Sequence, residues 1–180
     1  MAVETEEKLL SAALNLFSKN GYQSTTTMAI AAEAGVSEKT LFRKFKTKKN
    51  LFDQTVIFYI RRLNKDFNCR FKDYNYKTPS DFLKAFIMDL AILCTDNYEI
   101  IHLVLEDTIE PHRPAVNMWI EFVSSYAEDN IKNDAVDYPI FTMTILFFVY
   151  SLVNEKMHGR DVVDFDDALV KFVDNLAQGI

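Results

Sequence analysis

The feature that most constrains this fold is the spacing of apolar residues, which repeats at helical intervals along nearly the whole chain. Leu10, Ala13, Leu14 and Phe17 are three or four residues apart, so they share one face of a helix over residues 5–19. Later segments repeat this spacing, and none shows the alternation of apolar and polar residues that marks a half-buried strand. The sequence therefore predicts an all-α protein of about nine helices.

Residues that favour helix ends divide this pattern into segments. Gly21, Gly35 and Gly159 each follow a helical segment, where a residue without a Cβ is favoured. Side chains that can cap a helix N-terminus stand where segments begin, namely Thr25, Ser37, Thr47, Thr78, Asp137 and Asp164. We expect a three-helix head in residues 1–50 and a larger helical body in residues 51–180.

Two short helical segments meet at Gly35 within residues 24–46, which read STTTMAIAAEAGVSEKTLFRKFK. Gly35 permits a tight turn of positive φ, and Ile30, Val36 and Leu41 are placed to pack the two helices on the first. This pattern is typical of a helix-turn-helix, whose second helix enters the major groove of DNA. A plain corner between two helices would use the same apolar residues.

The charge distribution favours the DNA-binding interpretation over the plain corner. The chain carries a net charge of −6, yet residues 1–50 contain eight basic and five acidic residues. Residues 51–180 contain twelve basic and twenty-one acidic ones, and the stretch from Lys39 to Lys49 contains six basic residues and no acidic residue. A basic patch on an acidic body indicates a polyanionic partner, although a solvated helix face is the alternative.

The segment from Gly21 to Leu51 resembles the DNA-binding domain of the tetracycline-repressor (TetR) family. The matching residues are Ala12, Ala13, Leu16, Phe17, Gly21, Tyr22, Thr25, Thr26, Ile30, Ala31, Ala34, Gly35, Val36, Ser37, Thr40, Leu41, Phe42, Phe45, Lys48 and Leu51. The resemblance covers about a third of the chain, and the remainder matches only in outline. It implies a homodimer, a palindromic operator and a small effector bound in the C-terminal core.

The resemblance also implies which residues contact DNA. They lie at the start of the second helix, along the third helix and at the start of the fourth, namely Thr26, Thr27, Glu38, Lys39, Thr40, Phe42, Arg43, Lys44 and Lys48. Lys48 matches the lysine that meets a phosphate. Phe42 stands where the family commonly has Tyr, and Lys39 where it often has a small residue, so the operator of a relative cannot be transferred to this chain.

Aromatic residues of the body form either a filled core or the walls of a ligand pocket. We expect Trp119, Phe122, Tyr126, Phe147 and Tyr150 to face inward, with His102, Glu106, Asn117 and Tyr126 as polar anchors. No inward Arg or Lys is expected to pair with an anion. The sequence therefore predicts a lipophilic effector that is neutral or cationic, because aromatic faces attract positive charge.

The segment from residue 140 to residue 153 is apolar nearly all round, so we expect it to pack on its own body and on a partner. A two-fold interface is predicted from one face of this helix and one face of the last helix. Its residues are Phe141, Ile145, Phe148, Leu152, Leu169, Phe172, Val173 and Leu176.

Other functional classes find less support. His102 and Glu106 are four residues apart and could hold a metal, but a His–Glu hydrogen bond within or beside a pocket is the favoured interpretation. No hydrolase motif occurs, so we expect no enzyme, metal or cofactor.

Two cysteines without CxxC spacing suggest reduced thiols in the cytoplasm. We expect no signal peptide, and the apolar run from Ile140 to Val153 is too short to span a bilayer. The rivals are a ligand-independent regulator or activator and, remotely, a helical metal-dependent enzyme.

Overall fold

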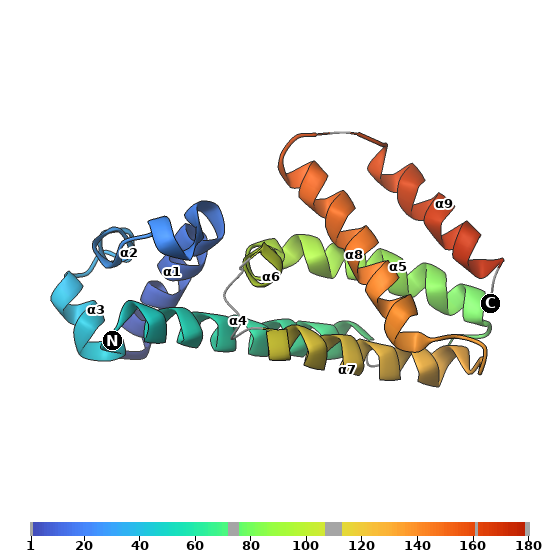
Figure 1. The fold of residues 1–180 in the computed structure, drawn as a ribbon, viewed down its shortest axis with the longest axis horizontal. Coiled ribbons are helices and arrows are strands. Elements are labelled where there is room, and N and C mark those ends of the chain that lie inside the picture. Colours follow the sequence, from blue (N-terminus) through green and yellow to red (C-terminus); the bar gives the residue numbers. More distant parts are fainter. Residues whose placement is uncertain (1, 72–75, 107–112, 161, 179–180) are drawn as a thin grey trace. The chain divides into compact units, whose positions relative to one another are not determined.

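Helices form all the regular secondary structure in the residues that the computed structural model describes, which are 2–71, 76–106, 113–160 and 162–178. Their bounds are α1 Ala2–Ser24, α2 Thr27–Glu33, α3 Glu38–Phe45, α4 Lys48–Phe71, α5 Pro79–Asp96, α6 Tyr98–Glu106, α7 Arg113–Ile131, α8 Tyr138–Met157 and α9 Phe165–Ala177 (Figure 1). The predicted all-α fold is confirmed.

Most predicted helix starts coincide with capping hydrogen bonds. In these, the residue before the helix accepts a hydrogen bond from a backbone N–H of the first turn, as do Ser37, Thr78, Asp137 and Asp164. The cap of α2 is Thr26, which accepts from the N–H of Ala29, and not Thr25 as predicted. The hydroxyl of Thr25 is buried and donates to the carbonyl oxygens of Leu16 and Gly21, at 3.0 and 2.8 Å.

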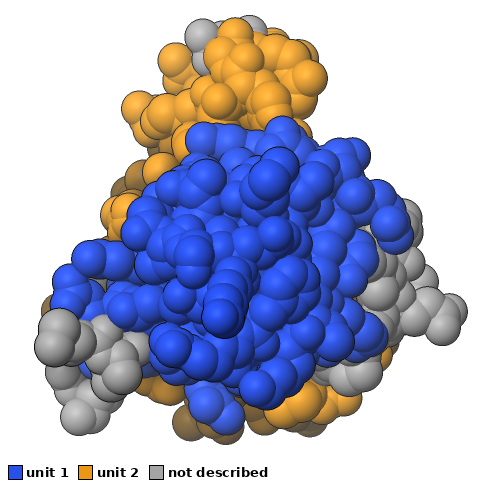
Figure 2. Space-filling model, turned by 90° about the vertical axis from the view of Figure 1, so that its left-hand side faces the viewer, with its two compact units in different colours: residues 1–65, 99–109 blue, residues 66–98, 110–180 orange. Residues whose placement is uncertain are grey.

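The chain divides into two compact units, which Figure 2 shows in different colours. Unit 1 holds residues 1–65 and 99–109, and unit 2 holds residues 66–98 and 110–180. The divisions fall inside α4 and at the start of α6. Unit 1 therefore extends past the predicted head at residues 1–50, because the first part of α4 and most of α6 pack with that head.

Unit 1 has a core built by all of its helices. Phe17 of α1 is fully buried and meets Phe52 of α4 edge-on, with ring centroids 5.0 Å apart. Leu41 of α3 is also fully buried, and α6 contributes Ile100 and Leu103 to the same cluster. Burial of this apolar surface is the main stabilising contribution to the small helices α2 and α3, which are too short to be stable alone.

Unit 2 is a layered helical body in which α5 packs against α7, α8 and α9 (Figure 1). Aromatic rings fill the space between α4, α5 and α7. Phe67 and Phe71 of α4 lie 4.3 Å apart between centroids, and Phe71 meets Phe86 of α5 at 5.4 Å. Tyr126 of α7 contacts these rings and donates its hydroxyl hydrogen to the carbonyl oxygen of Phe71 at 3.1 Å.

Helix α8 is longer than its apolar run suggested. With twenty residues, it is the one helix among the described residues that is long and apolar enough to cross a membrane by length and composition. The prediction that this segment is too short is therefore wrong. Such a helix is weak evidence for a membrane span, and α8 packs against α5, α7 and α9 through Ile145, Val149 and Val153.

The two cysteines occupy opposite environments within unit 2. Cys69 is exposed on α4, whereas Cys94 is buried on α5. Burial raises the pKa of the Cys94 thiol to about 12, because the thiolate would lose its hydration there. Both thiols are free, as the sequence predicted.

Candidate nucleic-acid interface

The turn between α2 and α3 is set by Gly35. Its φ of 68° lies in the left-handed region that glycine enters without a steric cost. The N–H of Gly35 donates to the carbonyl of Ala32 at 3.1 Å, and the N–H of Val36 donates to that of Ala31 at 2.9 Å. This pair of bonds is the Schellman arrangement, which ends α2 and directs the chain into α3.

Helix α3 is anchored by one face. Leu41 and Phe45 are buried in the core of unit 1, together with Ile30 of α2. The apolar residues predicted between the helices therefore lie where the helix-turn-helix pattern placed them, with Val36 half-buried beside them. Such packing fixes α3 in place on the head.

The opposite face of α3 is exposed and basic. Lys39, Phe42 and Arg43 are all exposed, and Lys46 continues this stripe one turn later. Within the described residues, neither Lys39 nor Arg43 forms an ion pair. Sequence reasoning missed Lys46, although its distance of seven residues from Lys39 is the signal that could have identified it.

Two residues expected on the exposed side of α3 are engaged within the head instead. Glu38 is half-buried and accepts a hydrogen bond from the hydroxyl of Thr27 at 2.6 Å. The side chain of Lys44 is 20% exposed and pairs with Glu6 of α1 at 3.2 Å. Both side chains therefore connect α3 to its neighbouring helices. They are less available to interact with an external partner than Lys39 and Arg43 are.

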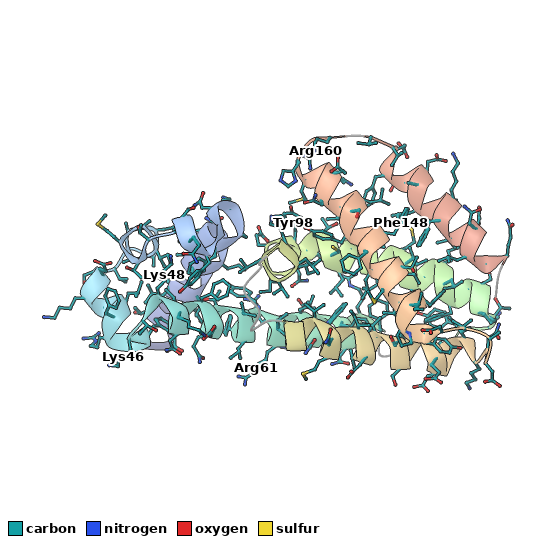
Figure 3. All side chains as sticks on the ribbon, viewed as in Figure 1. Lys46, Lys48, Arg61, Tyr98, Phe148 and Arg160 are labelled. Atoms are coloured by element: carbon teal, nitrogen blue, oxygen red, sulfur yellow. The ribbon has the colours of Figure 1, made fainter. Side chains whose placement is uncertain are left out.

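The start of α4 supplies a further cation close to the head surface. The ammonium of Lys48 lies 4.4 Å from the ring centroid of Tyr22 and donates to the carbonyl oxygen of Gln23 at 3.3 Å (Figure 3). Partial burial lowers the pKa of Lys48. The N-terminus of a helix favours an anion at this position, because the first backbone N–H groups point outward.

The residues expected to line a ligand pocket do not all come together. Trp119, Phe122 and Tyr126 surround Phe67, with ring centroids 5.1 to 5.7 Å from it. Phe147 and Phe122 are 44% and 41% exposed, so the expected inward positions of both are wrong, although the ring of Phe122 still meets that of Phe67. Among the other expected lining residues, Tyr150 is buried, Asn117 is exposed and His102 belongs to unit 1, while the side chain of Glu106 lies outside the described residues.

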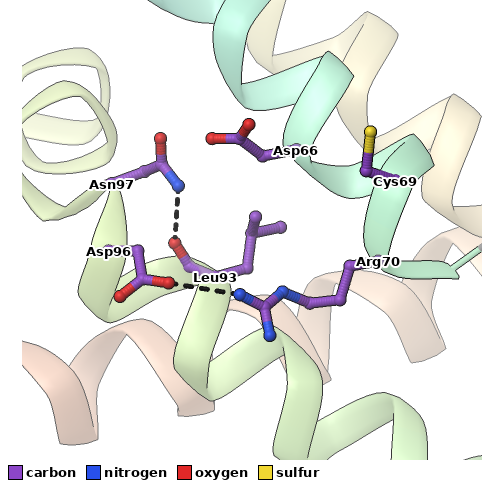
Figure 4. Close-up of a pocket in the computed structure, with 6 residues that line it drawn as sticks. All are labelled: Asp66, Cys69, Arg70, Leu93, Asp96 and Asn97. Atoms are coloured by element: carbon purple, nitrogen blue, oxygen red, sulfur yellow. Dashed lines mark hydrogen bonds and ion pairs between the residues drawn. The ribbon is translucent and has the colours of Figure 1, made fainter.

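A cleft in unit 2 is polar rather than aromatic (Figure 4). It has a volume of about 540 Å³ and is lined by Asp66, Cys69, Arg70, Leu93, Asp96 and Asn97. Arg70 pairs with Asp96 at 3.2 Å and with Asp89 at 3.7 Å. In the described part of the chain no group of three or more acidic, histidine or cysteine side chains could hold a metal ion.

Part of the expected dimer surface is buried inside the protomer. Ile145, Leu169 and Val173 are at most 5% exposed, so they belong to the core of unit 2 rather than to an accessible face. Phe148 and Phe172 stack on one another at 3.8 Å and join α8 to α9. The rest of the predicted set is half-buried, namely Phe141, Leu152 and Leu176.

A different stripe of α8 is exposed. Ile140, Met143 and Phe147 follow one another at intervals of three and four residues and are 63%, 43% and 44% exposed. Val170 of α9 is also exposed, at 49%. An exposed apolar row of this kind is typical of a surface that a partner covers.

Comparison with known proteins places these features in a family. Residues 9–55 match the tetR family of bacterial regulatory proteins. The HTH-type transcriptional regulator YerO of Bacillus subtilis is 24% identical over 191 residues, which cover 98% of this chain and 66% of YerO. The HTH-type transcriptional regulator QacR of Staphylococcus aureus is 31% identical over 134 residues, which cover 73% of this chain and 61% of QacR. The chain thus spans just under two thirds of these relatives' lengths.

Solved structures share the fold. A TetR-like transcriptional regulator from Rhodococcus sp. RHA1 has a TM-score of 0.74 and 18% identity, covering 97% of this chain and 93% of that one. A transcriptional regulator from Saccharomonospora viridis, solved in complex with choline, has a TM-score of 0.73 and 15% identity, covering 98% and 96%. At these identities the likeness concerns the fold alone.

Proposed function

The chain belongs to the TetR family of transcriptional regulators, and from this premise we propose that it is a ligand-responsive repressor. It acts in the cytoplasm as a homodimer, binds a palindromic operator through two copies of α3, and releases that operator when a small molecule enters the body. Proteins of this family are regulators rather than enzymes, so the site of interest is a binding surface.

The observation that carries the DNA-binding part is the exposed face of α3. Arg43 is free to hold a guanine through two hydrogen bonds, and the ring of Phe42 suits the methyl group of thymine. Lys39 adds charge beside them, and Lys48 is placed to meet a phosphate at the start of α4. Thr26 and Thr40 are assigned to contacts with the sugar-phosphate backbone. The hydroxyl of Thr27 donates to Glu38 and is therefore not assigned to a phosphate.

Selection of binding sites from random duplex DNA tests this part. The expected result is an inverted repeat whose half-site centres lie about one helical turn apart, roughly 34–36 Å, because two symmetric heads must reach successive major grooves. Enrichment of a single half-site or of a direct repeat would contradict a symmetric dimer. Failure to enrich any sequence would contradict sequence-specific binding by α3.

The homodimer is supported by the exposed row of Ile140, Met143 and Phe147 on α8. A two-fold axis places the same row of a second copy against it, which is the usual isologous contact. Val170 of α9 extends the apolar surface. The half-buried residues of the predicted set contribute at its edges, while Ile145, Leu169 and Val173 support it from within.

The effector is proposed to be a lipophilic molecule, neutral or cationic, that contacts the rings around Phe67. Aromatic faces attract a cation, and the Saccharomonospora viridis regulator with this fold was solved with choline. Phe67 and Phe71 lie on α4, the helix that also carries Lys48. A ligand that moves these rings would thereby act on the helix that begins beside the DNA-binding face.

The effector can be sought with the chain's single tryptophan, Trp119, which lies 5.7 Å from Phe67. A thermal-shift screen uses matched lipophilic cations, neutral compounds and anions, and each hit is titrated by tryptophan fluorescence and by mobility shift with the selected operator. We expect cationic or neutral hits to quench the fluorescence and to weaken operator binding. Hits that are only anionic, or that leave operator affinity unchanged, would contradict this account of the effector.

A further inference from the structure

The chain leaves the recognition helix through a strained turn at Lys46. This residue has φ 65° and ψ −44°, and the N–H of Thr47 donates to the carbonyl of Phe45 at 2.7 Å. A hydrogen bond across one central residue of positive φ defines the rare form of the γ-turn, which is unfavourable for a residue with a Cβ. Glycine would adopt this backbone more readily than lysine.

Neighbouring residues hold this turn in place. The side-chain amide of Asn50 donates to the carbonyl of Phe45 at 2.8 Å, and the N–H of Asn50 donates to the hydroxyl of Thr47 at 3.0 Å. Phe45 and Leu51, on either side, are buried in the core of unit 1. The strain at Lys46 therefore persists because the surroundings determine the backbone, as at many functional sites.

The side chain of Lys46 is exposed at the turn between α3 and α4 (Figure 3). It lies seven residues after Lys39 and three after Arg43, and its ammonium donates to the carbonyl oxygen of Arg43 at 2.9 Å. An ammonium has three N–H groups, so two remain for another acceptor. Lys46 thus adds a third exposed cation to the C-terminal end of the basic face.

We propose that Lys46 is a phosphate-contacting residue for duplex DNA, and that its strained backbone is tolerated because it positions this cation. The inference rests on DNA binding through α3, the first part of the proposed function. In the alternative, Lys46 serves only its own helix by satisfying the carbonyl of Arg43. The two interpretations differ in salt dependence, since only a phosphate contact displaces a counterion from DNA.

The test compares Lys46→Gly with Lys132→Gly. Lys132 is the other described non-glycine residue of positive φ, at 55°, and it lies in unit 2 after α7. Both changes remove one charge and replace one non-glycine residue of positive φ by glycine, so they are matched. Binding to a random-sequence duplex is measured by fluorescence anisotropy between about 50 and 200 mM salt.

For Lys46→Gly we expect the slope of log affinity against log salt to fall by about 0.9. Over this fourfold change in salt, the factor by which the wild type loses affinity is then about 3.5 times the factor for the variant. Lys132→Gly should match the wild type. Lys46→Asn, which removes the charge and introduces a residue that occurs at positive φ more often than most, provides a second variant should the glycine variant fold poorly.

An unchanged slope in folded Lys46→Gly or Lys46→Asn would overturn the inference and leave the self-capping role. A loss confined to the selected operator, with random DNA unaffected, would also overturn it, because it would indicate base recognition. If the wild type itself bound no duplex, the proposed function would fail. The two failures are therefore distinguishable.

Discussion

Helices α3 and α8 bury their apolar residues in different ways. On α3 the two faces are chemically distinct, with buried Leu41 and Phe45 on one side and exposed Lys39 and Arg43 on the other. On α8 apolar residues occur on every side, so buried Ile145 and exposed Phe147 are only two residues apart. The spacing of residues therefore determines which side of α3 is inside, but it does not do so for α8.

This difference has a functional meaning. A helix with one polar face needs one apolar neighbour, and α3 has it in the head. A helix that is apolar all round needs neighbours on all sides. Within unit 2, α8 packs with α5, α7 and α9, while the row Ile140, Met143 and Phe147 stays exposed, as the proposed partner surface requires.

The largest effects should come from the buried side of each helix. Leu41→Ala and Ile145→Ala should each lower the free energy of unfolding by about 2–5 kcal/mol, because each leaves a cavity in a packed core. Denaturant unfolding at a fixed protein concentration measures this. If Ile145→Ala kept full stability but abolished dimerisation, Ile145 would belong to the interface, and its assignment to the core of unit 2 would be contradicted.

Substitutions on the exposed side of α8 should weaken dimerisation rather than folding. Phe147→Asp should weaken dimerisation by about 2 kcal/mol or more, since it places a charge in the apolar contact. Met118→Asp on α7 is the control, because Met118 is an exposed apolar residue outside the expected interface. Sedimentation equilibrium should show an average mass shifted toward that of the monomer for the first variant only. Equal behaviour of the two would remove α8 from the interface.

Substitutions on the exposed side of α3 should lower the affinity for DNA. Arg43→Ala should cost about 1–3 kcal/mol of operator affinity and relax the preference at one base pair. Lys44→Ala should cost less, because Lys44 is largely covered and paired with Glu6. Competition binding with single-base operator variants measures both. A larger loss for Lys44→Ala would mean that the ion pair with Glu6 opens on DNA.

The smallest effects concern how α2 and α8 end. Both finish in the same Schellman arrangement, with Gly35 at φ 68° and Gly159 at φ 64°. Gly35→Ala and Gly159→Ala should each cost about 1 kcal/mol of stability, through backbone strain, since no atom lies within 4 Å of either added Cβ. Only Gly35→Ala should also weaken operator binding, because it precedes α3. An equal loss of DNA affinity in both would contradict this.

The head could be predicted from sequence largely because its signals are local. Gly35, Ser37 and the apolar residues Ile30 and Leu41 each act within a few residues of their own position, and the structure places them as expected. The all-α fold follows from the same helical spacing. Thr25 shows the limit of such signals, since two adjacent threonines can cap α2 and only packing selects Thr26.

The remaining features depend on neighbours that are distant in sequence. Glu38 and Lys44 look exposed by spacing, yet Thr27 and Glu6 engage them. The backbone of Lys46 is set by Asn50 and by two buried flanking residues, and no composition signals it. On α8 the apolar residues have no preferred side, so their spacing does not predict which side is buried. The positions of α5, α7 and α9 determine it.

The contrast between Cys69 and Cys94 makes this chain ready for spectroscopic labelling without any substitution. The thiolate of a cysteine attacks a maleimide or methanethiosulfonate reagent. Cys69 is exposed to such a reagent, whereas Cys94 is buried, and this burial raises the pKa of its thiol to about 12, so that it stays protonated near neutral pH. In the proposed homodimer, one nitroxide per chain near the end of α4 would allow the distance between the two labels to be measured. Distances recorded with and without DNA or effector would then report directly on the movement of the helix that also carries Lys48.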